Sequence, residues 1–237
     1  MSKAALVTGG AKRIGKAIAL SLAEAGYDIA LHYNHSESEA KQLAAEITAL
    51  GRACELIKAD VASSNACGQA VLQAVERFPH LNVLINNASV FDRASFKETD
   101  AELLALQFDV NFQAPFFLTQ SFARQVKEGV VINLIDSRVG RNRHTHFAYL
   151  LSKKALFEFT KMAAVELAPN IRVCGICPGF VLPSLGFEKD YEEQLKSQNP
   201  LKSIATVEDI TRAVHTLIGT TGMTGQFIFL DGGEALL

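Results

Sequence analysis

The chain has 237 residues, of which 49% are hydrophobic and 20% are charged, and this composition excludes a generally disordered protein. The formal net charge of −2 argues against a nucleic-acid-binding protein. No apolar run approaches the roughly 18 residues of a membrane helix, and the N-terminus has no signal-peptide layout, so we expect a cytoplasmic protein without a membrane partner.

Short apolar runs alternate with helical patterns along the whole chain. The predicted strands are Ala4–Thr8, Asp28–Tyr33, Cys54–Ala59, Asn82–Asn86, Val130–Ile135, Ile171–Ile176 and Gln226–Leu230. The predicted helices lie near residues 13–25, 37–50, 64–77, 100–127, 147–167 and 206–219. Because the strands are apolar on both faces, we expect a parallel sheet covered by helices on each side. The sequence therefore predicts an α/β fold, a Rossmann-type doubly wound parallel sheet of about seven strands, in a single domain over residues 1–237.

The stretch 178–205 breaks this rhythm. It is interrupted by prolines, and a short charged helix is predicted near residues 188–197. We interpret the stretch as a substrate flap within the domain. Just before it, Cys174 and Cys177 form a C-x-x-C pattern inside a predicted strand. Without a second C-x-x-C, we expect buried packing and no metal site.

The first predicted strand runs directly into the turn TGGAKRIG, residues 8–15, and then into a helix. Glycines in such a turn let the backbone approach a pyrophosphate, and the helix N-terminus offers free N–H groups and the positive end of the helix dipole. The position of the turn at the first strand-to-helix junction favours a dinucleotide site over a tight turn alone. The candidate cofactor-binding residues here are Gly9, Lys12, Arg13, Ile14 and Gly15.

The residues after the second strand indicate which dinucleotide is bound. An enzyme for NAD usually has an Asp or Glu there to bind the ribose 2′-hydroxyl, whereas the stretch LHYNHS has no acid. The candidates to meet a 2′-phosphate instead are Lys12, Arg13, His35 and Ser36. Arg and Lys suit that dianion, so we predict NADPH; the alternative is a set of ordinary surface charges.

The ends of the third and fourth strands supply further candidates. Asp60 and Val61 follow the third strand and are predicted to lie near the adenine. Asn87, Ala88 and Ser89 follow the fourth strand at the carboxyl edge of the sheet, where ligands of such sheets bind.

Three residues later in the chain are candidates for the chemistry. Asp136 stands where the fifth predicted strand ends, and Tyr149 and Lys153 follow at a spacing that puts both on one helix face. An ammonium beside a phenol favours the phenolate and lowers the pKa of the tyrosine. We therefore expect Tyr149 to donate or accept a proton near neutral pH.

The chain resembles the short-chain dehydrogenase/reductase family from about Ala4 to Gly233. The resemblance rests on TGGAKRIG, DV at 60–61, NNAS at 86–89, Asn111, YLLSK at 149–153, PG at 178–179 and the ending GQFIFLDGG. It implies hydride transfer from a nicotinamide, with Tyr149 as the acid and Lys153 bound to the nicotinamide ribose. It also implies that Asn111 holds a water in a proton relay, that Pro178 and Gly179 bind the cofactor, and that the protein is a homotetramer.

The chain departs from the usual family pattern at one catalytic position. The family usually has a serine thirteen positions before the tyrosine, where this chain has Asp136. The pteridine reductases and the related dihydromonapterin reductases carry Asp there. Further features similar to that branch are Arg13 within KRIG, the HY-x-x-S stretch of His32, Tyr33 and Ser36, and Phe91 two residues after NNAS. One mismatch is His35, where the branch often has Arg.

This closer resemblance implies a substrate. A pterin or folate ring would stack between Phe91 and the nicotinamide, with Arg13 and Ser89 also holding it. A pterin ring nitrogen must be protonated as hydride reaches the adjacent carbon, and the carboxyl group of Asp136 can pass on a proton, directly or through Tyr149. The expected activity is the NADPH-dependent reduction of a dihydropterin or dihydrofolate, for example dihydrobiopterin.

The loop between Asp136 and Tyr149 is basic. Its basic residues are Arg138, Arg141, Arg143, His144 and His146. One interpretation is a solvated or subunit-contact loop. The other is the attraction of an anionic substrate tail, such as the glutamate of a folate.

Two alternatives to the pteridine hypothesis stay open. The first is a carbonyl reductase of the same family, of the 3-oxoacyl-thioester type, in which Ser137 does the work of the usual serine. The second is a regulatory protein that binds NADPH without catalysis, against which the Tyr149–Lys153 pair and Asn111 argue.

Overall fold

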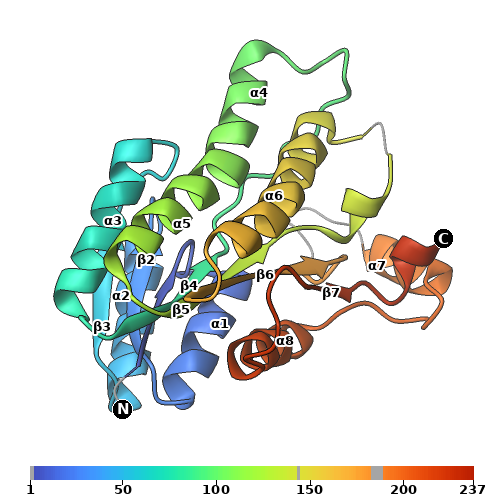
Figure 1. Ribbon diagram of the computed structural model, residues 1–237. Helices are drawn as coiled ribbons and strands as arrows, with labels where there is room; N and C mark the ends of the chain where they lie inside the picture. The colour runs from blue at the N-terminus through green and yellow to red at the C-terminus, as the bar shows by residue number, and fades with distance from the viewer. Residues whose placement is uncertain (1–2, 143–144, 183–188) are drawn as a thin grey trace.

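A twisted parallel sheet forms the centre of the molecule (Figure 1). The computed structural model describes residues 3–142, 145–182 and 189–237. Within them, seven strands lie in the order β3-β2-β1-β4-β5-β6-β7, and every neighbouring pair is parallel. The strands are β1 (Ala4–Val7), β2 (Asp28–Tyr33), β3 (Cys54–Lys58), β4 (Leu81–Asn86), β5 (Gly129–Leu134), β6 (Ile171–Pro178) and β7 (Phe227–Leu230). The predicted doubly wound fold is confirmed.

Helices cover both faces of the sheet (Figure 1). They are α1 (Arg13–Glu24), α2 (Glu37–Ala49), α3 (Ser64–Arg77), α4 (Ala101–Phe108), α5 (Ala114–Gln125), α6 (Phe147–Glu166), α7 (Lys189–Gln198) and α8 (Val207–Gly219). One apolar core joins α1, α2 and α8 to the sheet, and a second joins α3, α5 and α6 to it. Each fully buried Leu or Ile side chain in these cores stabilises the fold by roughly 1.5–3 kcal/mol.

The single helix predicted over residues 100–127 is wrong in one detail. A π-helical segment, η1 (Asp109–Gln113), separates α4 from α5. Pro115 at the start of α5 has no N–H to donate, so one backbone bond of an uninterrupted α-helical ladder cannot form. Such π-helical insertions are frequent at functional sites, and this one lies directly beside the loop after β4.

The strand order fixes where a ligand can bind. The chain winds outward from β1 in one direction to β3 and, after crossing to β4, in the other direction to β7. The crevice at such a reversal opens at the carboxyl ends of the strands. The Gly-rich turn after β1, the loop after β4, Asp136 after β5 and the segment after β6 all reach this edge.

The remaining expectations about the chain can be stated briefly. Cys174 and Cys177 lie buried in β6, and burial raises the pKa of both thiols. Among the residues described, no three potential metal ligands form a cluster, and no helix there is both long and apolar enough to cross a membrane. The predicted flap coincides with the end of β6 and with α7, but its residues 183–188 lie outside the described residues.

Candidate active site

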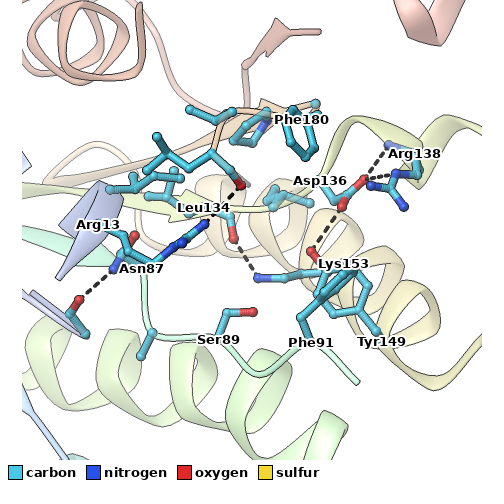
Figure 2. A pocket seen from close by; sticks show the side chains of 18 of the residues that line it. Arg13, Asn87, Ser89, Phe91, Leu134, Asp136, Arg138, Tyr149, Lys153 and Phe180 are labelled. Atoms are coloured by element: carbon cyan, nitrogen blue, oxygen red, sulfur yellow. Dashed lines mark hydrogen bonds and ion pairs between the residues drawn. The ribbon is translucent and has the colours of Figure 1, made fainter. Parts of the chain in front are cut away.

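A pocket of about 1120 Å³ opens at the carboxyl edge of the sheet (Figure 2). It is lined by most of the residues that were predicted from the sequence to form the site. These are Gly9, Lys12, Arg13, Ile14, Gly15, Asn87, Ala88, Ser89, Phe91, Asp136, Tyr149, Lys153, Pro178 and Gly179. Segments far apart in the chain therefore meet around one cavity.

Other predicted site residues do not line this pocket: His32, Tyr33, His35, Ser36, Asp60, Val61 and Asn111. His32 is buried, and both ring nitrogens are used within the protein. Its Nδ1 accepts from the N–H of Gly9 at 3.1 Å, and its Nε2 lies 3.1 Å from the carbonyl of Ala59. This arrangement requires a neutral ring, in agreement with burial lowering the pKa of His32. In this structure His32 supports the Gly-rich turn from behind.

Hydrogen bonds from β1 and β4 fix the Gly-rich turn. The hydroxyl of Thr8 donates to the carbonyl of Ile85 and accepts from the N–H groups of Asn87 and Ala88. The side-chain amide of Asn87 donates to the carbonyls of Thr8 and Gly9 at 2.9 and 3.1 Å. A Cβ on Gly15 would lie 2.2 Å from the Gly9 carbonyl oxygen, so only glycine fits this turn.

The N-terminus of α1 is open toward the pocket. Lys12 is the N-cap residue, and its side chain makes no capping bond, so the first N–H groups of the helix remain available to a phosphate. Instead, the Lys12 ammonium pairs with Glu39 at 2.7 Å. Both residues also line a second cavity of about 420 Å³, beside α2.

Arg13 has a left-handed backbone, with φ of 54°, and reaches across the pocket. Its Nη2 donates to the carbonyl of Leu182 at 3.0 Å (Figure 2). Arg13 therefore connects the Gly-rich turn to the segment that follows β6.

Asn111 uses all of its side-chain hydrogen-bonding capacity within the protein. Its Oδ1 accepts from the Ser89 hydroxyl and the Val90 N–H, and its Nδ2 donates to the Val90 carbonyl and to Gln107. The side chain is fully buried. Asn111 thus anchors the loop after β4, and its side chain has no bond left for the water that the resemblance implied.

Asp136 and Tyr149 form the centre of the site (Figure 2). The Tyr149 hydroxyl donates to Oδ2 of Asp136 at 3.0 Å, while Oδ1 of Asp136 accepts from the backbone N–H of Arg138 at 2.8 Å. The Arg138 guanidinium lies 3.5 Å from the same Oδ1. The neighbouring Ser137 does not line the pocket, and its hydroxyl is buried without a hydrogen-bond partner.

The pKa expected for Tyr149 requires a correction. Burial, with a smaller effect from the adjacent Asp136, raises the pKa of Tyr149 well above its usual value. Lys153 does not offset this, because its Nζ donates to the carbonyl of Leu134 at 2.9 Å and lies 5.8 Å from the centre of the Tyr149 ring. Burial also lowers the pKa of Lys153 to about 8. The tyrosine is therefore a protonated donor in the free protein.

The sequence comparison with known families agrees with this geometry. A family model described as short chain dehydrogenase matches residues 3–194. The chain belongs to the short-chain dehydrogenase family.

Individual relatives within this family differ in their substrates. A 3-oxoacyl-[acyl-carrier-protein] reductase, FabG, from Staphylococcus epidermidis is 31% identical over 98% of this chain and 99% of its own length. An L-rhamnose 1-dehydrogenase (NAD(P)(+)) from a Sphingomonas species is 29% identical over 98% of this chain and 95% of its own.

Two solved structures are similar over nearly the whole chain. The FolM alternative dihydrofolate reductase 1 of Brucella suis, in complex with NADP, has a TM-score of 0.94 and 35% identity, and covers 99% of this chain and 95% of its own. The corresponding Brucella canis protein, also complexed with NADP, has a TM-score of 0.93 and 36% identity, and covers 100% of this chain and 95% of its own.

Sequence reasoning missed several residues of this short-chain dehydrogenase pocket. They are Arg93, Leu134, Ile135, Thr145, Phe180, Val181 and Leu182. The position of Arg93 two residues after Phe91 could have indicated it, whereas nothing in the pattern of residues 180–182 does. Of the basic loop, Arg138 and His146 line the pocket and Arg141 does not, while residues 143–144 lie outside the described residues.

Proposed function

We propose that this short-chain dehydrogenase is an NADPH-dependent pteridine reductase, which transfers hydride to a ring carbon of a dihydropterin or dihydrofolate. The observation that carries the proposal is the contact of Asp136 with Tyr149 on the pocket wall, at the position where the family usually has serine. A carbonyl substrate needs a hydrogen-bond donor at that position, whereas a ring nitrogen needs a proton source.

The pocket fits a dinucleotide phosphate. Gly15 lets the turn fold tightly, since a Cβ there would clash with the Gly9 carbonyl oxygen, and the first N–H groups of α1 have no side-chain cap. The second cavity has positive charge for a 2′-phosphate, supplied by Lys12, Arg13 and Lys16. Lys12 would pair with this phosphate in place of Glu39. The NADP bound in the two similar Brucella structures supports the same cofactor.

The chain's own residues divide the remaining tasks. When bound, the dinucleotide supplies the hydride. Lys153, buried in the pocket wall, would bind the nicotinamide ribose with its ammonium. Tyr149, protonated and 3.0 Å from Asp136, would deliver a proton to the ring nitrogen beside the carbon being reduced. Asp136 would take up a proton from solvent and pass it to Tyr149, while the backbone N–H of Arg138 holds the carboxyl group in position.

The position of Phe91 favours a flat heteroaromatic substrate. It lies on the pocket wall 46% exposed, and its ring centre is 4.6 Å from that of Tyr149 in an edge-to-face arrangement. A ring stacked on Phe91 would therefore be adjacent to the proton donor. Such stacking contributes roughly 0.5–1.5 kcal/mol beyond burial alone.

The two rival functions have weaker support. A 3-oxoacyl-thioester reductase is favoured by the FabG relative, but it needs the Ser137 hydroxyl in the pocket, and that hydroxyl is buried elsewhere. A non-catalytic NADPH-binding protein would have no need of a buried Tyr149, Asp136 and Lys153 around a common cavity.

The test is an assay of NADPH oxidation with four substrates in parallel: dihydrobiopterin, dihydromonapterin, dihydrofolate and an acetoacetyl thioester. The proposal predicts turnover with at least one pteridine and little with the thioester. Turnover of the thioester alone would overturn it in favour of the carbonyl reductase. NADPH binding without turnover of any substrate would favour the regulatory protein.

The homotetramer stays a prediction. Exposed apolar side chains on α4 and α6 support subunit contacts through these helices. They are Leu104, Leu106, Leu151, Met162 and Val165. Light scattering of the purified protein measures its mass directly, and a monomeric mass would contradict the prediction.

A further inference from the structure

Positive charge gathers at the end of the pocket that lies away from the Gly-rich turn. Arg93, Arg138 and His146 line this end. Asp136 is the one carboxylate among the described lining residues; it already pairs with the Arg138 guanidinium at 3.5 Å and accepts from the Tyr149 hydroxyl. Figure 2 shows Arg138 beyond Asp136, on the side away from Lys153 and Arg13. A pteridine with an uncharged tail would bring no negative charge to compensate Arg93.

Arg93 lies in the exposed loop that follows Phe91. Within the described part of the chain, its guanidinium forms no ion pair closer than 4.0 Å, although Glu98 is near enough for Arg93 to help lower the pKa of that carboxyl group. The two nearby carboxylates have other partners: Asp92 accepts from Gln107, and Glu98 accepts from the N–H of Ser95. An exposed guanidinium at a pocket rim is well suited to bind an anion.

His146 is held in an unusual conformation directly before α6. Its backbone is left-handed, with φ of 54° and ψ of 48°, which is costly for a residue with a Cβ and is found mostly where function requires it. Its ring stacks on Phe91 with 4.3 Å between ring centres and 13° between planes. Its Nδ1 is buried and has no hydrogen-bond partner, which leaves a polar atom unsatisfied in the pocket wall.

The charges that act on His146 come from the loop after β4, with Arg93, and from the segment after β5, with Asp136 and Arg138. Burial lowers the pKa of His146, and the guanidinium groups of Arg138 and Arg93 lower it further, while Asp136 acts in the opposite direction. The Phe91 ring that stacks on His146 also contacts Tyr149 of α6. Two arginines close to His146 therefore disfavour its protonation, and an anion bound among the three side chains would reverse this effect.

We propose that Arg93, Arg138 and His146 form an anion subsite for a carboxylate on the tail of the substrate, which selects folate-type pteridines over pteridines with uncharged tails. The inference rests on the proposed function. It also revises the role expected of the basic loop, because Arg141 does not line the pocket and Arg93, outside that loop, does. Phe91 links the two parts of the site, since it contacts Tyr149 on the reacting side and His146 on the charged side.

The subsite implies a pH effect of defined sign. Burial and the two nearby guanidinium groups lower the pKa of His146, which favours its neutral form in the free protein. A bound carboxylate raises that pKa, so binding takes up a proton. The KM of dihydrofolate should therefore fall as the pH is lowered from 7.5 to 5.5, whereas the KM of dihydrobiopterin should stay level. Raising the salt concentration should weaken dihydrofolate binding alone.

The experiment compares KM and kcat for dihydrofolate and dihydrobiopterin in the wild type and in Arg93→Ala, Arg93→Glu and His146→Phe. Arg93→Ala should raise the KM of dihydrofolate about tenfold and Arg93→Glu more, with less than about a twofold change for dihydrobiopterin. His146→Phe keeps the ring on Phe91 and should abolish the pH dependence of the dihydrofolate KM. Lys97→Ala removes a charge from the same loop outside the pocket and serves as the control.

Each outcome of this experiment either supports or overturns the anion subsite. Equal changes for both substrates in Arg93→Glu, or an equal effect of Lys97→Ala, would overturn the anion subsite while leaving the pteridine reductase intact. If the wild type reduces neither pteridine, the proposed function fails, and calorimetric binding of folate and biopterin then tests the subsite alone. Tighter binding of folate that is lost in Arg93→Glu would support it, and equal binding of the two would exclude it.

Discussion

The two halves of the pocket, which we propose to bind the cofactor and the substrate, are built in different ways. The cofactor half consists of backbone and small side chains that hydrogen bonds hold tightly, as between Thr8, Asn87 and the Gly-rich turn. The substrate half consists of longer side chains from loops and from the start of α6, including Phe91, Asp136 and His146. A ligand meets mostly main chain in the first half and mostly side chains in the second.

This difference explains how relatives with different substrates can share the fold. The cofactor half depends on the strand order and on turns where a single Cβ would clash, so it tolerates little change. The substrate half can exchange side chains without disturbing the sheet. The FabG and L-rhamnose dehydrogenase relatives, each covered over at least 95% of its length, have names that differ in the substrate.

Removing the Tyr149 hydroxyl should damage only the substrate half. We expect Tyr149→Phe to lower kcat by about 10²–10⁴-fold, because the proton donor is lost, while the dissociation constant of NADPH changes little. Stopped-flow turnover and fluorescence titration measure the two quantities. Tyr27→Phe removes another buried hydroxyl that lies outside the pocket and should leave kcat unchanged. A comparable loss of NADPH affinity in Tyr149→Phe would contradict the separation of the halves.

Adding one methyl group should break the cofactor half. The Cβ of Gly15→Ala would lie 2.2 Å from a backbone oxygen, so the turn must shift and NADPH affinity should fall about 100-fold, or about 2.7 kcal/mol. Gly68→Ala is the matched control, because its Cβ meets nothing within 4 Å in the middle of α3. That change should stabilise the fold by about 0.5–1 kcal/mol. Unaltered NADPH binding in Gly15→Ala would show that the turn is adaptable.

The buried Lys153 lies between the halves and should give a distinctive pH dependence of stability. Because its pKa is lowered from 10.5 to about 8, the unfolded chain holds a proton above pH 8 that the folded protein has released. The contribution of Lys153 to the free energy of unfolding should therefore rise with pH, by about 2 kcal/mol between pH 8 and 10.

Urea denaturation of the wild type and of Lys153→Met isolates this effect. The thiols of Cys54 and Cys67, whose pKa values are raised to about 12, act in the opposite direction in both proteins and cancel in the difference. The difference in the free energy of unfolding between the two proteins should increase with pH. A constant difference would mean that Lys153 keeps its ordinary pKa.

A smaller effect should follow from removing the aromatic wall of the substrate half. Phe91→Leu should raise the KM of a pteridine about 3- to 10-fold, in line with the roughly 0.5–1.5 kcal/mol of aromatic stacking. The KM of NADPH should not change. Phe96→Leu alters a more exposed phenylalanine, 71% exposed and outside the pocket, and should change neither KM. An unchanged pteridine KM in Phe91→Leu would remove Phe91 from the substrate site.

The cofactor half could be predicted from the sequence more completely than the substrate half. Apolar strands and the turn TGGAKRIG determine the sheet and its switch point, because these features depend on local pattern. The role of His32, in the same half, could not be predicted. The sequence puts His32 at the correct strand end, but only the structure shows both ring nitrogens bonded inside the protein.

The substrate half depends on long-range packing. No local pattern distinguishes the π-helical turn at Asn111 from α-helix. None indicates that His146 adopts a left-handed backbone close to two arginines. The lowering expected for the pKa of Tyr149 was wrong for the same reason, since helical spacing from Lys153 says nothing about burial or about which carbonyl the ammonium contacts.

The most direct test of the central claim compares Asp136→Asn with Ser137→Ala, in turnover of NADPH and a dihydropterin. Asparagine keeps the shape of Asp136 and can still accept from the Tyr149 hydroxyl, but it cannot carry a proton. We predict that Asp136→Asn lowers kcat about 100-fold or more and that Ser137→Ala changes it less than about twofold. The larger loss in Ser137→Ala would contradict the account and identify Asp136 as a structural residue at the end of β5.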